Sequence, residues 1–147
     1  MDCIFCAIVA GEAPSRKVDE DEHWVAFLDV NPVTSGHALV VPRRHADDLF
    51  AMDEDGVRHL MAGVHRVAGL LRERLTPAGL NLVQSNGTAA WQTVFHVHVH
   101  VLPRYENDGL RPPSPHVPAS PDDLAAVHDR IRGGSPRQAR PVADHPA

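Results

Sequence analysis

Three histidines alternate with valines close to residue 100: His96, His98 and His100 are separated by Val97 and Val99. In an extended strand successive side chains point to opposite faces, so the three imidazoles are expected to share one face. Imidazole attacks electrophiles, transfers protons or binds metals near pH 7 without a large shift of its pKa. The spacing therefore predicts a strand that carries a chemically active surface.

Two chemistries fit this row of histidines. In the first, His96, His98 and His100 bind a catalytic zinc ion, because a His-x-His pair on a strand suits two ligands of an open site. In the second, one neutral ring is a nucleophile while its other N–H is held by an acceptor. Phosphorus suits this attack, and neighbouring rings then bind phosphate oxygens or handle the leaving group's proton. The row alone leaves both open.

The only two cysteines, Cys3 and Cys6, are three residues apart at the start of the chain. Two cysteines give no disulfide framework, and three interpretations remain: a redox pair, two unrelated structural cysteines, or half of a zinc site. A redox pair is expected after a strand, which is missing here. A zinc site needs two further ligands, and His45 and His96 are the natural candidates because each flanks a predicted strand.

Several polar side chains lie close to these residues in the sequence. His37 begins a strand and can reach the same site. Asp29, at the end of another strand, suits either hydroxyl binding or turn formation. Gln92 and Thr93 offer an amide and a hydroxyl to a phosphate just before the histidine row. The remaining histidines are expected to be solvated, namely His23, His59, His65, His116, His128 and His145.

The pattern of apolar residues predicts an α+β fold, an antiparallel sheet of about five strands with one long helix packed on it. Four strands are located at 24–28, 37–42, 80–84 and 95–102, and most connections are too short for parallel crossovers. Apolar residues at helical spacing predict the helix, which Asp53 caps and Thr76 with Pro77 ends. Residues 46–52 are expected to form one or two helical turns.

Length and composition indicate one principal domain. The chain has 147 residues, 43% of them hydrophobic and 22% charged. We expect a catalytic domain over 1–110, an extension with a short capped helix over 111–132, and a disordered tail over 133–147. The net charge of −5 argues against nucleic-acid binding. No apolar stretch is long enough to span a membrane and no secretory signal begins the chain, so a cytoplasmic location is expected.

The motifs resemble those of the histidine triad (HIT) superfamily, and specifically bacterial HIT proteins with a zinc-binding Cys-x-x-Cys. The resemblance covers about residues 1 to 110. It rests on the segments 3–12, 27–32, 36–42, 44–45, 92–96 and the histidine row up to Leu102. The resemblance implies a homodimer that hydrolyses or transfers nucleotides at the α-phosphate, with structural zinc and no organic cofactor.

The resemblance also implies a role for each matching residue. His98 would be the nucleophile that forms a nucleotidyl-histidine, with His100 and His37 contacting the phosphate and aiding proton transfer. Ser85 stands where many relatives carry an amide, so Ser85 through water, or Asn86 in its place, would approach the phosphate. The further expected contacts are Gln92 and Thr93 to phosphate, Asp29 to the ribose, Ile4, Phe5, Ile8 and Leu28 to the base, and Cys3, Cys6, His45 and His96 to zinc.

The implied substrates are purine nucleotides with a second group on the α-phosphate: dinucleoside polyphosphates, phosphoramidates or acyl-adenylates. The ending from Val101 to Arg104 favours the dinucleoside-polyphosphate branch. Two alternatives are a zinc-dependent metallohydrolase that uses the histidine row, and a nucleotide-binding protein without catalysis.

Overall fold

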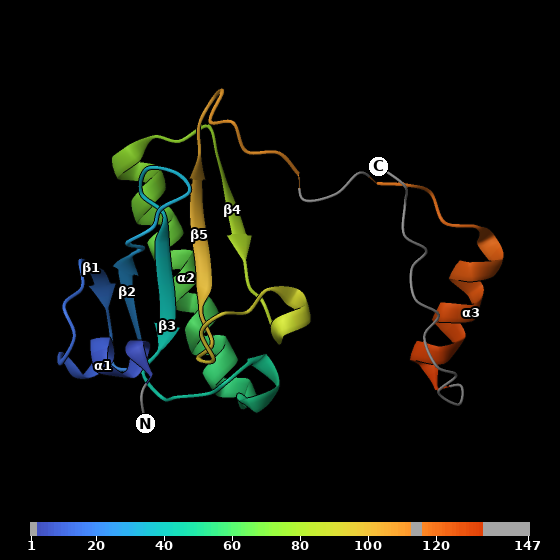
Figure 1. Ribbon diagram of the computed structural model, residues 1–147, viewed down its shortest axis with the longest axis horizontal. Helices are drawn as coiled ribbons and strands as arrows, with labels where there is room; N and C mark the ends of the chain where they lie inside the picture. The colour runs from blue at the N-terminus through green and yellow to red at the C-terminus, as the bar shows by residue number, and fades with distance from the viewer. Residues whose placement is uncertain (1–2, 113–115, 134–147) are drawn as a thin grey trace. The chain divides into compact units, whose positions relative to one another are not determined.

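The architecture is a five-stranded antiparallel sheet with a long helix on one face (Figure 1). The computed structural model describes residues 3–112 and 116–133. The chain divides into two units between Gly109 and Leu110, and the sheet belongs to the first. This arrangement confirms the α+β class predicted from the sequence. The first unit contains α1 (Ile4–Ala10), β1 (Lys17–Glu20), β2 (Trp24–Leu28), β3 (Ala38–Pro42), α2 (Glu54–Leu75), β4 (Gly79–Val83) and β5 (Val99–Arg104), with the strands in the order β1-β2-β3-β5-β4.

The sheet is covered on both faces, which explains why its central strands are continuous apolar runs. In β2, Trp24 and Ala26 belong to the core under α2, whereas Val25 and Phe27 belong to a second core. That second core includes Phe5 and other residues of α1. Strands buried on both faces lose the apolar–polar alternation of half-exposed strands. The face covered by α1 is also the face that carries the histidines.

Helix α2 follows the predicted pattern closely. Asp53 caps it, accepting a hydrogen bond of 2.7 Å from the Gly56 N–H. Leu60, Val64 and Val67 face the sheet and are buried, as one stripe of an amphipathic helix should be. Figure 1 shows α2 running behind the sheet, along β3 and β5.

The histidine row is only partly a strand, which corrects the prediction of a strand over 95–102. Ladder pairing begins at Val99, opposite Val40 of β3. Two residues after Val40, Pro42 has no N–H to donate to the ladder. Its carbonyl accepts a hydrogen bond of 2.9 Å from the His96 ring. The Val97 N–H donates instead to the Ala46 carbonyl. Even so, the valines still point to the α2 side, where Val97 is fully buried.

The structure also contains several short elements, most of which have no counterpart in the sequence prediction. Helix α1 and edge strand β1 were not predicted, and two 3-10 turns, η1 (Leu49–Ala51) and η2 (Thr88–Ala90), flank the site loops. Of these, η1 falls within the helical turns expected over 46–52.

The second unit contains α3 (Pro121–Arg132), capped by the Ser120 hydroxyl where the sequence predicts a capped helix. The expected disordered tail over 133–147 falls, after Gly133, outside the described residues. Within the described ranges, no helix combines the length and apolar character needed to cross a bilayer.

Candidate active site and metal centre

The His98 ring is held so that one nitrogen remains free. Its Nδ1–H donates a hydrogen bond of 2.7 Å to the His96 carbonyl. The proton therefore sits on Nδ1, and Nε2 keeps an unshared electron pair. Phe5 of α1 packs edge-on against the ring at 5.2 Å between centroids, and only 6% of His98 is exposed. A neutral imidazole fixed in this tautomer can act as a nucleophile through Nε2.

His37 and His100 form a pair of rings in which each ring carries its proton on Nε2, whereas His98 carries its proton on Nδ1. The Val33 backbone N–H donates to His37 Nδ1 at 3.3 Å, so the His37 proton resides on Nε2. That nitrogen lies 2.8 Å from His100 Nδ1 and 3.5 Å from the Asp29 carboxylate. Since His100 Nδ1 accepts from His37, the His100 proton must reside on Nε2. His98 thus offers an electron pair, and His100 offers an N–H.

Burial keeps the paired rings neutral. The pKa of His100 is lowered to about 4, mainly by burial and in addition by the neighbouring His98 and His37 rings. The pKa of His37 is also lowered by burial, although the Asp29 carboxylate partly opposes that shift. His98 and His100 are adjacent, with ring centroids 4.9 Å apart. The two rings therefore lie side by side with complementary hydrogen-bonding roles, an electron pair on His98 and an N–H on His100.

These two rings line a cavity of about 490 Å³. His98, His100, Asp29 and Thr93 give its wall polar groups, whereas α1 and the end of β2 give it an apolar surface. A cavity with this division suits a ligand that joins an apolar planar part to a charged part. Of the residues expected to contact a nucleotide, it brings together Ile4, Phe5, Ile8, Leu28, Asp29, Thr93, His98 and His100.

Four residues expected near the phosphate lie outside this wall: His37, whose ring contacts His100 instead, and Gln92, Asn86 and Ser85. Gln92 is 3% exposed, and its amide is fully engaged: Oε1 accepts from the Gly87 N–H, and Nε2 donates to the Asp47 and Val94 carbonyls. The Asn86 amide bonds to Gln84 and to the Leu49 N–H. The Ser85 carbonyl accepts from Gln84. The Gln92 and Asn86 side chains brace the loop between β4 and the histidines.

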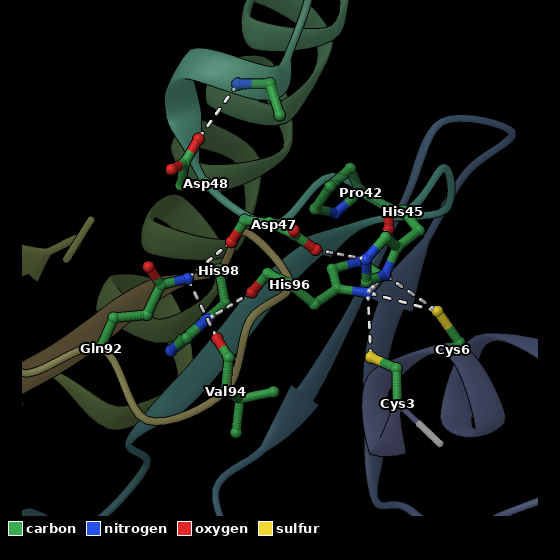
Figure 2. A network of polar contacts seen from close by, with 11 residues as sticks. Cys3, Cys6, Pro42, His45, Asp47, Asp48, Gln92, Val94, His96 and His98 are labelled. Carbon is green, nitrogen blue, oxygen red and sulfur yellow. Dashed lines mark hydrogen bonds and ion pairs between the residues drawn. The ribbon is translucent and has the colours of Figure 1, made fainter. Parts of the chain in front are cut away.

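Next to the cavity, Cys3, Cys6, His45 and His96 form a compact group (Figure 2). The Cys3 and Cys6 sulfurs lie 3.4 and 3.5 Å from His96 Nδ1, and the two Nδ1 atoms lie 3.2 Å apart. The two Nδ1 atoms are too close together for both of them to carry protons. Two thiolates and two imidazoles are the ligand set of a closed structural zinc site.

Hydrogen bonds behind the two imidazoles support this assignment. The other nitrogen of each ring, Nε2, faces an acceptor: the Asp47 carboxylate for His45 at 2.8 Å, and the Pro42 carbonyl for His96 at 2.9 Å. Each Nε2 therefore carries the proton, which leaves Nδ1 as a metal ligand. The residues fit a zinc ion.

A second group of side chains is close enough together to hold a metal, but its hydrogen bonds do not leave the ring nitrogens free as ligands. Asp29, His37 and His100 have ligand atoms within 4.8 Å of one another. However, the Val33 N–H occupies His37 Nδ1 and places the proton on Nε2, toward the other two groups. This arrangement favours a proton-relay pair over a cation site. In the part of the chain that the structure describes, no metal-capable group contains His96, His98 and His100 together.

The structure also contains contributors that the sequence analysis did not single out. Asp47 lies two residues after His45, a spacing that could have suggested a carboxylate behind a metal ligand. Val33 acts through its backbone N–H, and no side-chain pattern identifies such a donor. Phe27, Leu39 and Val94 complete the apolar wall of the cavity.

A model of a known protein family matches this chain over residues 10–107, and its description is "HIT domain". The chain belongs to the HIT domain family. A crystal structure of a HIT family member from Bacillus subtilis superimposes with a TM-score of 0.85 at 37% identity. That match covers 94% of this chain and all of the other.

Two further relatives bear on the chemistry of this HIT protein. A crystal structure described as a Zn-bound histidine triad family protein, from Mycobacterium smegmatis, has 43% identity and a TM-score of 0.71, covering 78% of this chain and 85% of the other. A protein of Schizosaccharomyces pombe named adenosine 5'-monophosphoramidase hnt1 is 36% identical over 132 residues. The alignment covers 89% of this chain and 96% of that protein.

Proposed function

We propose that this HIT protein hydrolyses or transfers nucleotides at the α-phosphate through a covalent nucleotidyl-His98 intermediate. One observation carries the proposal: a free Nε2 electron pair on His98 and an N–H on His100 border the same cavity. Attack on phosphorus needs an electron pair at the nucleophile and donors for the phosphate oxygens or the leaving group.

The proposed reaction has two balanced steps. The His98 Nε2 pair forms a bond to the α-phosphorus, and the bond to the leaving group breaks. That group leaves with its electron pair, stabilised by a hydrogen bond from the His100 Nε2–H, and takes its proton from solvent. The His96 carbonyl stabilises the charge that develops on the His98 ring. Water then attacks phosphorus, the N–P bond breaks with its pair returning to Nε2, and the proton lost by the water passes to solvent. Another acceptor in place of water gives transfer.

The proposed substrates are purine nucleotides whose α-phosphate carries a second group. The apolar wall made by Ile4, Phe5, Ile8 and Leu28 supports binding of a base, and Asp29 supports binding of ribose hydroxyls. The name of the Schizosaccharomyces pombe relative supports a phosphoramidate. Acyl-adenylates and dinucleoside polyphosphates present the same α-phosphorus to His98, so they remain in the substrate class.

We assign zinc to Cys3, Cys6, His45 and His96. A closed four-ligand site supplies structural stability, because it keeps no open position for water. The Zn-bound relative from Mycobacterium smegmatis supports the choice of metal.

A homodimer is also proposed, with β4 at its interface. Both β1 and β4 are edge strands. Charged Lys17, Asp19 and Glu20 protect the β1 edge, whereas β4 exposes Leu82 (48%) and Val83 (42%). An apolar, unprotected edge is where a second chain adds to a sheet. The cytoplasmic location stays a prediction.

The test is a panel of phosphoramidates, acyl-adenylates and dinucleoside polyphosphates assayed with the wild type and His98→Ala. We expect turnover of at least one class, and a loss of at least about 1,000-fold in the variant with zinc content unchanged. His65→Ala, which alters an exposed histidine of α2, is the control. Loss of zinc in His98→Ala would favour the metallohydrolase, and AMP binding without turnover of any substrate would favour a non-catalytic binder.

A further inference from the structure

The zinc ligands and the cavity wall are interleaved along α1. Cys3 and Cys6 reach the metal group, while Ile4 and Phe5, which lie between them, line the cavity. Phe5 also contacts the His96 and His98 rings edge-on, with centroids 6.0 and 5.2 Å away. A helix of 7 residues is too short to be stable alone. Its attachment through the two sulfurs therefore helps to fix one wall of the cavity.

His96 belongs to both sites. Its ring presents Nδ1 to the metal group, and its carbonyl accepts the hydrogen bond that sets the tautomer of His98. Figure 2 shows these two contacts on opposite sides of the same residue. A shift of His96 therefore moves the acceptor on which the nucleophile depends.

A second connection runs from His45 to the loop that carries Thr93. His45 Nε2 donates to the Asp47 carboxylate at 2.8 Å, and the Asp47 carbonyl accepts from Gln92 Nε2 at 2.6 Å. Gln92 in turn holds the Gly87 N–H at 2.7 Å and the Val94 carbonyl at 3.1 Å. Both Thr93 and Val94 line the cavity. Figure 2 shows this chain of contacts from the metal ligands to Val94.

We propose that Asp47 and Gln92 are positioning residues that, with His96, couple occupancy of the metal centre to binding of the nucleotide. The inference rests on the proposed function for the identity of the ligand. Zinc then fixes three features of one cavity: the position of α1, the tautomer of His98, and the position of the loop braced by Gln92. The metal centre regulates the site without contacting the substrate.

The coupling has a quantitative consequence. If zinc raises the affinity for a nucleotide by some factor, the nucleotide must raise the affinity for zinc by the same factor. We expect a factor of about 10, within the usual range for coupled sites. AMP is the probe: its Kd is measured by calorimetry on zinc-loaded and zinc-stripped full-length protein, and the Kd of zinc is measured by chelator competition with and without AMP.

Amide hydrogen exchange adds a readout that needs neither AMP nor turnover. Gly87 donates its N–H to Gln92, so its exchange reports the brace directly. We expect zinc removal to accelerate exchange at Gly87, while buried amides of α2, such as those of Val64 and Val67, stay protected. Protection in α2 shows that the fold persists in the stripped protein.

Asp47→Ala removes the carboxylate behind His45 and leaves the backbone contact to Gln92. Loss of such a partner typically lowers metal affinity about 10- to 100-fold. We expect zinc affinity to fall in that range, and the coupling factor between zinc and AMP to move toward one. Asp48→Ala is the matched control, because among the described residues the Asp48 carboxylate accepts a hydrogen bond only from the Ala51 N–H of η1. Both values should stay at the wild-type level in that control.

Equal AMP affinity in the loaded and stripped proteins, together with unchanged exchange at Gly87, would overturn the coupling. So would an Asp47→Ala variant whose coupling factor equals that of Asp48→Ala. If AMP binds neither form, the proposed function fails separately. In that case Gly87 exchange alone decides whether the metal centre holds the loop.

Discussion

At the scale of single residues, the three histidines differ because a different group holds one nitrogen of each ring. The Pro42 carbonyl holds His96 Nε2, so Nδ1 faces the cysteines. The His96 carbonyl holds His98 Nδ1, which leaves Nε2 free. His37 donates to His100 Nδ1, which places the proton on the other nitrogen. Identical side chains thus present different ring nitrogens, which supports the proposed roles of ligand for His96, nucleophile for His98 and donor for His100.

The depressed pKa of His100 predicts a loss of stability in acid. The folded pKa is about 4, below the ordinary value of 6.5. Between these values the unfolded chain binds more protons, so the free energy of unfolding falls as the pH drops from 6.5 toward 4. Urea unfolding at a series of pH values measures that slope. The slope should be smaller in His100→Gln. An unchanged slope would show that the lowered pKa of His100 is not the cause of the acid sensitivity.

His37→Phe tests the proton relay between His37 and His100. The substitution removes the proton that fixes the tautomer of His100, so the electron pair and the proton of that ring can exchange places. We expect kcat to fall about 100-fold, which is typical for a lost acid–base contribution, with a smaller change in KM. Steady-state kinetics and the ¹⁵N shifts of His100 measure both effects, against His65→Ala as control. Wild-type kcat with an altered His100 tautomer would show that the relay is dispensable.

At the scale of elements, the helices and strands that the sequence predicts well are those with long periodic patterns of apolar residues. The α2 stripe and the runs of β2 and β3 identify the core. The roles proposed for His98 and the metal ligands come from the resemblance to HIT motifs, because the spacing of the histidine row alone leaves two chemistries open. The strand over 95–102 was wrong at its start because a proline carbonyl and a ring nitrogen compete with the ladder at His96. Contacts such as that of the Val33 N–H depend on the backbone alone, and no residue pattern reports them.

Gly63 and Gly69 of α2 give a matched test of packing between helix and sheet. A Cβ at Gly63 would lie 2.5 Å from the Trp24 ring, whereas a Cβ at Gly69 would meet nothing within 4 Å. Gly63→Ala should destabilise the fold by about 1–3 kcal/mol through overpacking. Gly69→Ala should stabilise it by about 0.5–1 kcal/mol, because alanine favours the helix. Thermal unfolding compares the two, and equal effects would contradict the close approach of α2 to Trp24.

At the scale of the whole molecule, the sheet combines one face that carries the proposed site with one unprotected edge. The cavity and the metal group lie on the α1 side of the sheet, and α2 closes the other side. The edges of the sheet differ in charge and in apolar exposure. The molecule therefore keeps its site and its proposed interface on separate parts of one sheet.

Leu82→Lys tests the proposed interface. A lysine on β4 places a charge on the apolar edge, so we expect the dimer to dissociate into monomers. Sedimentation velocity gives the masses of wild type and variant. Lys17→Glu, at the opposite edge, is the control and should leave the dimer intact. A monomeric wild type, or a dimeric Leu82→Lys protein, would exclude β4 as the interface.

The central claim is covalent catalysis by His98, and trapping the intermediate tests it most directly. The protein is mixed with the substrate that turns over fastest, quenched in alkali because N–P bonds are labile in acid, and digested for mass spectrometry. We expect one nucleotidyl group on the peptide that contains His98 and assign it to that residue by fragmentation. The adduct should be absent from His98→Ala protein that retains its zinc. A nucleotidyl group on another residue, or turnover at the wild-type rate in His98→Ala, would contradict the account.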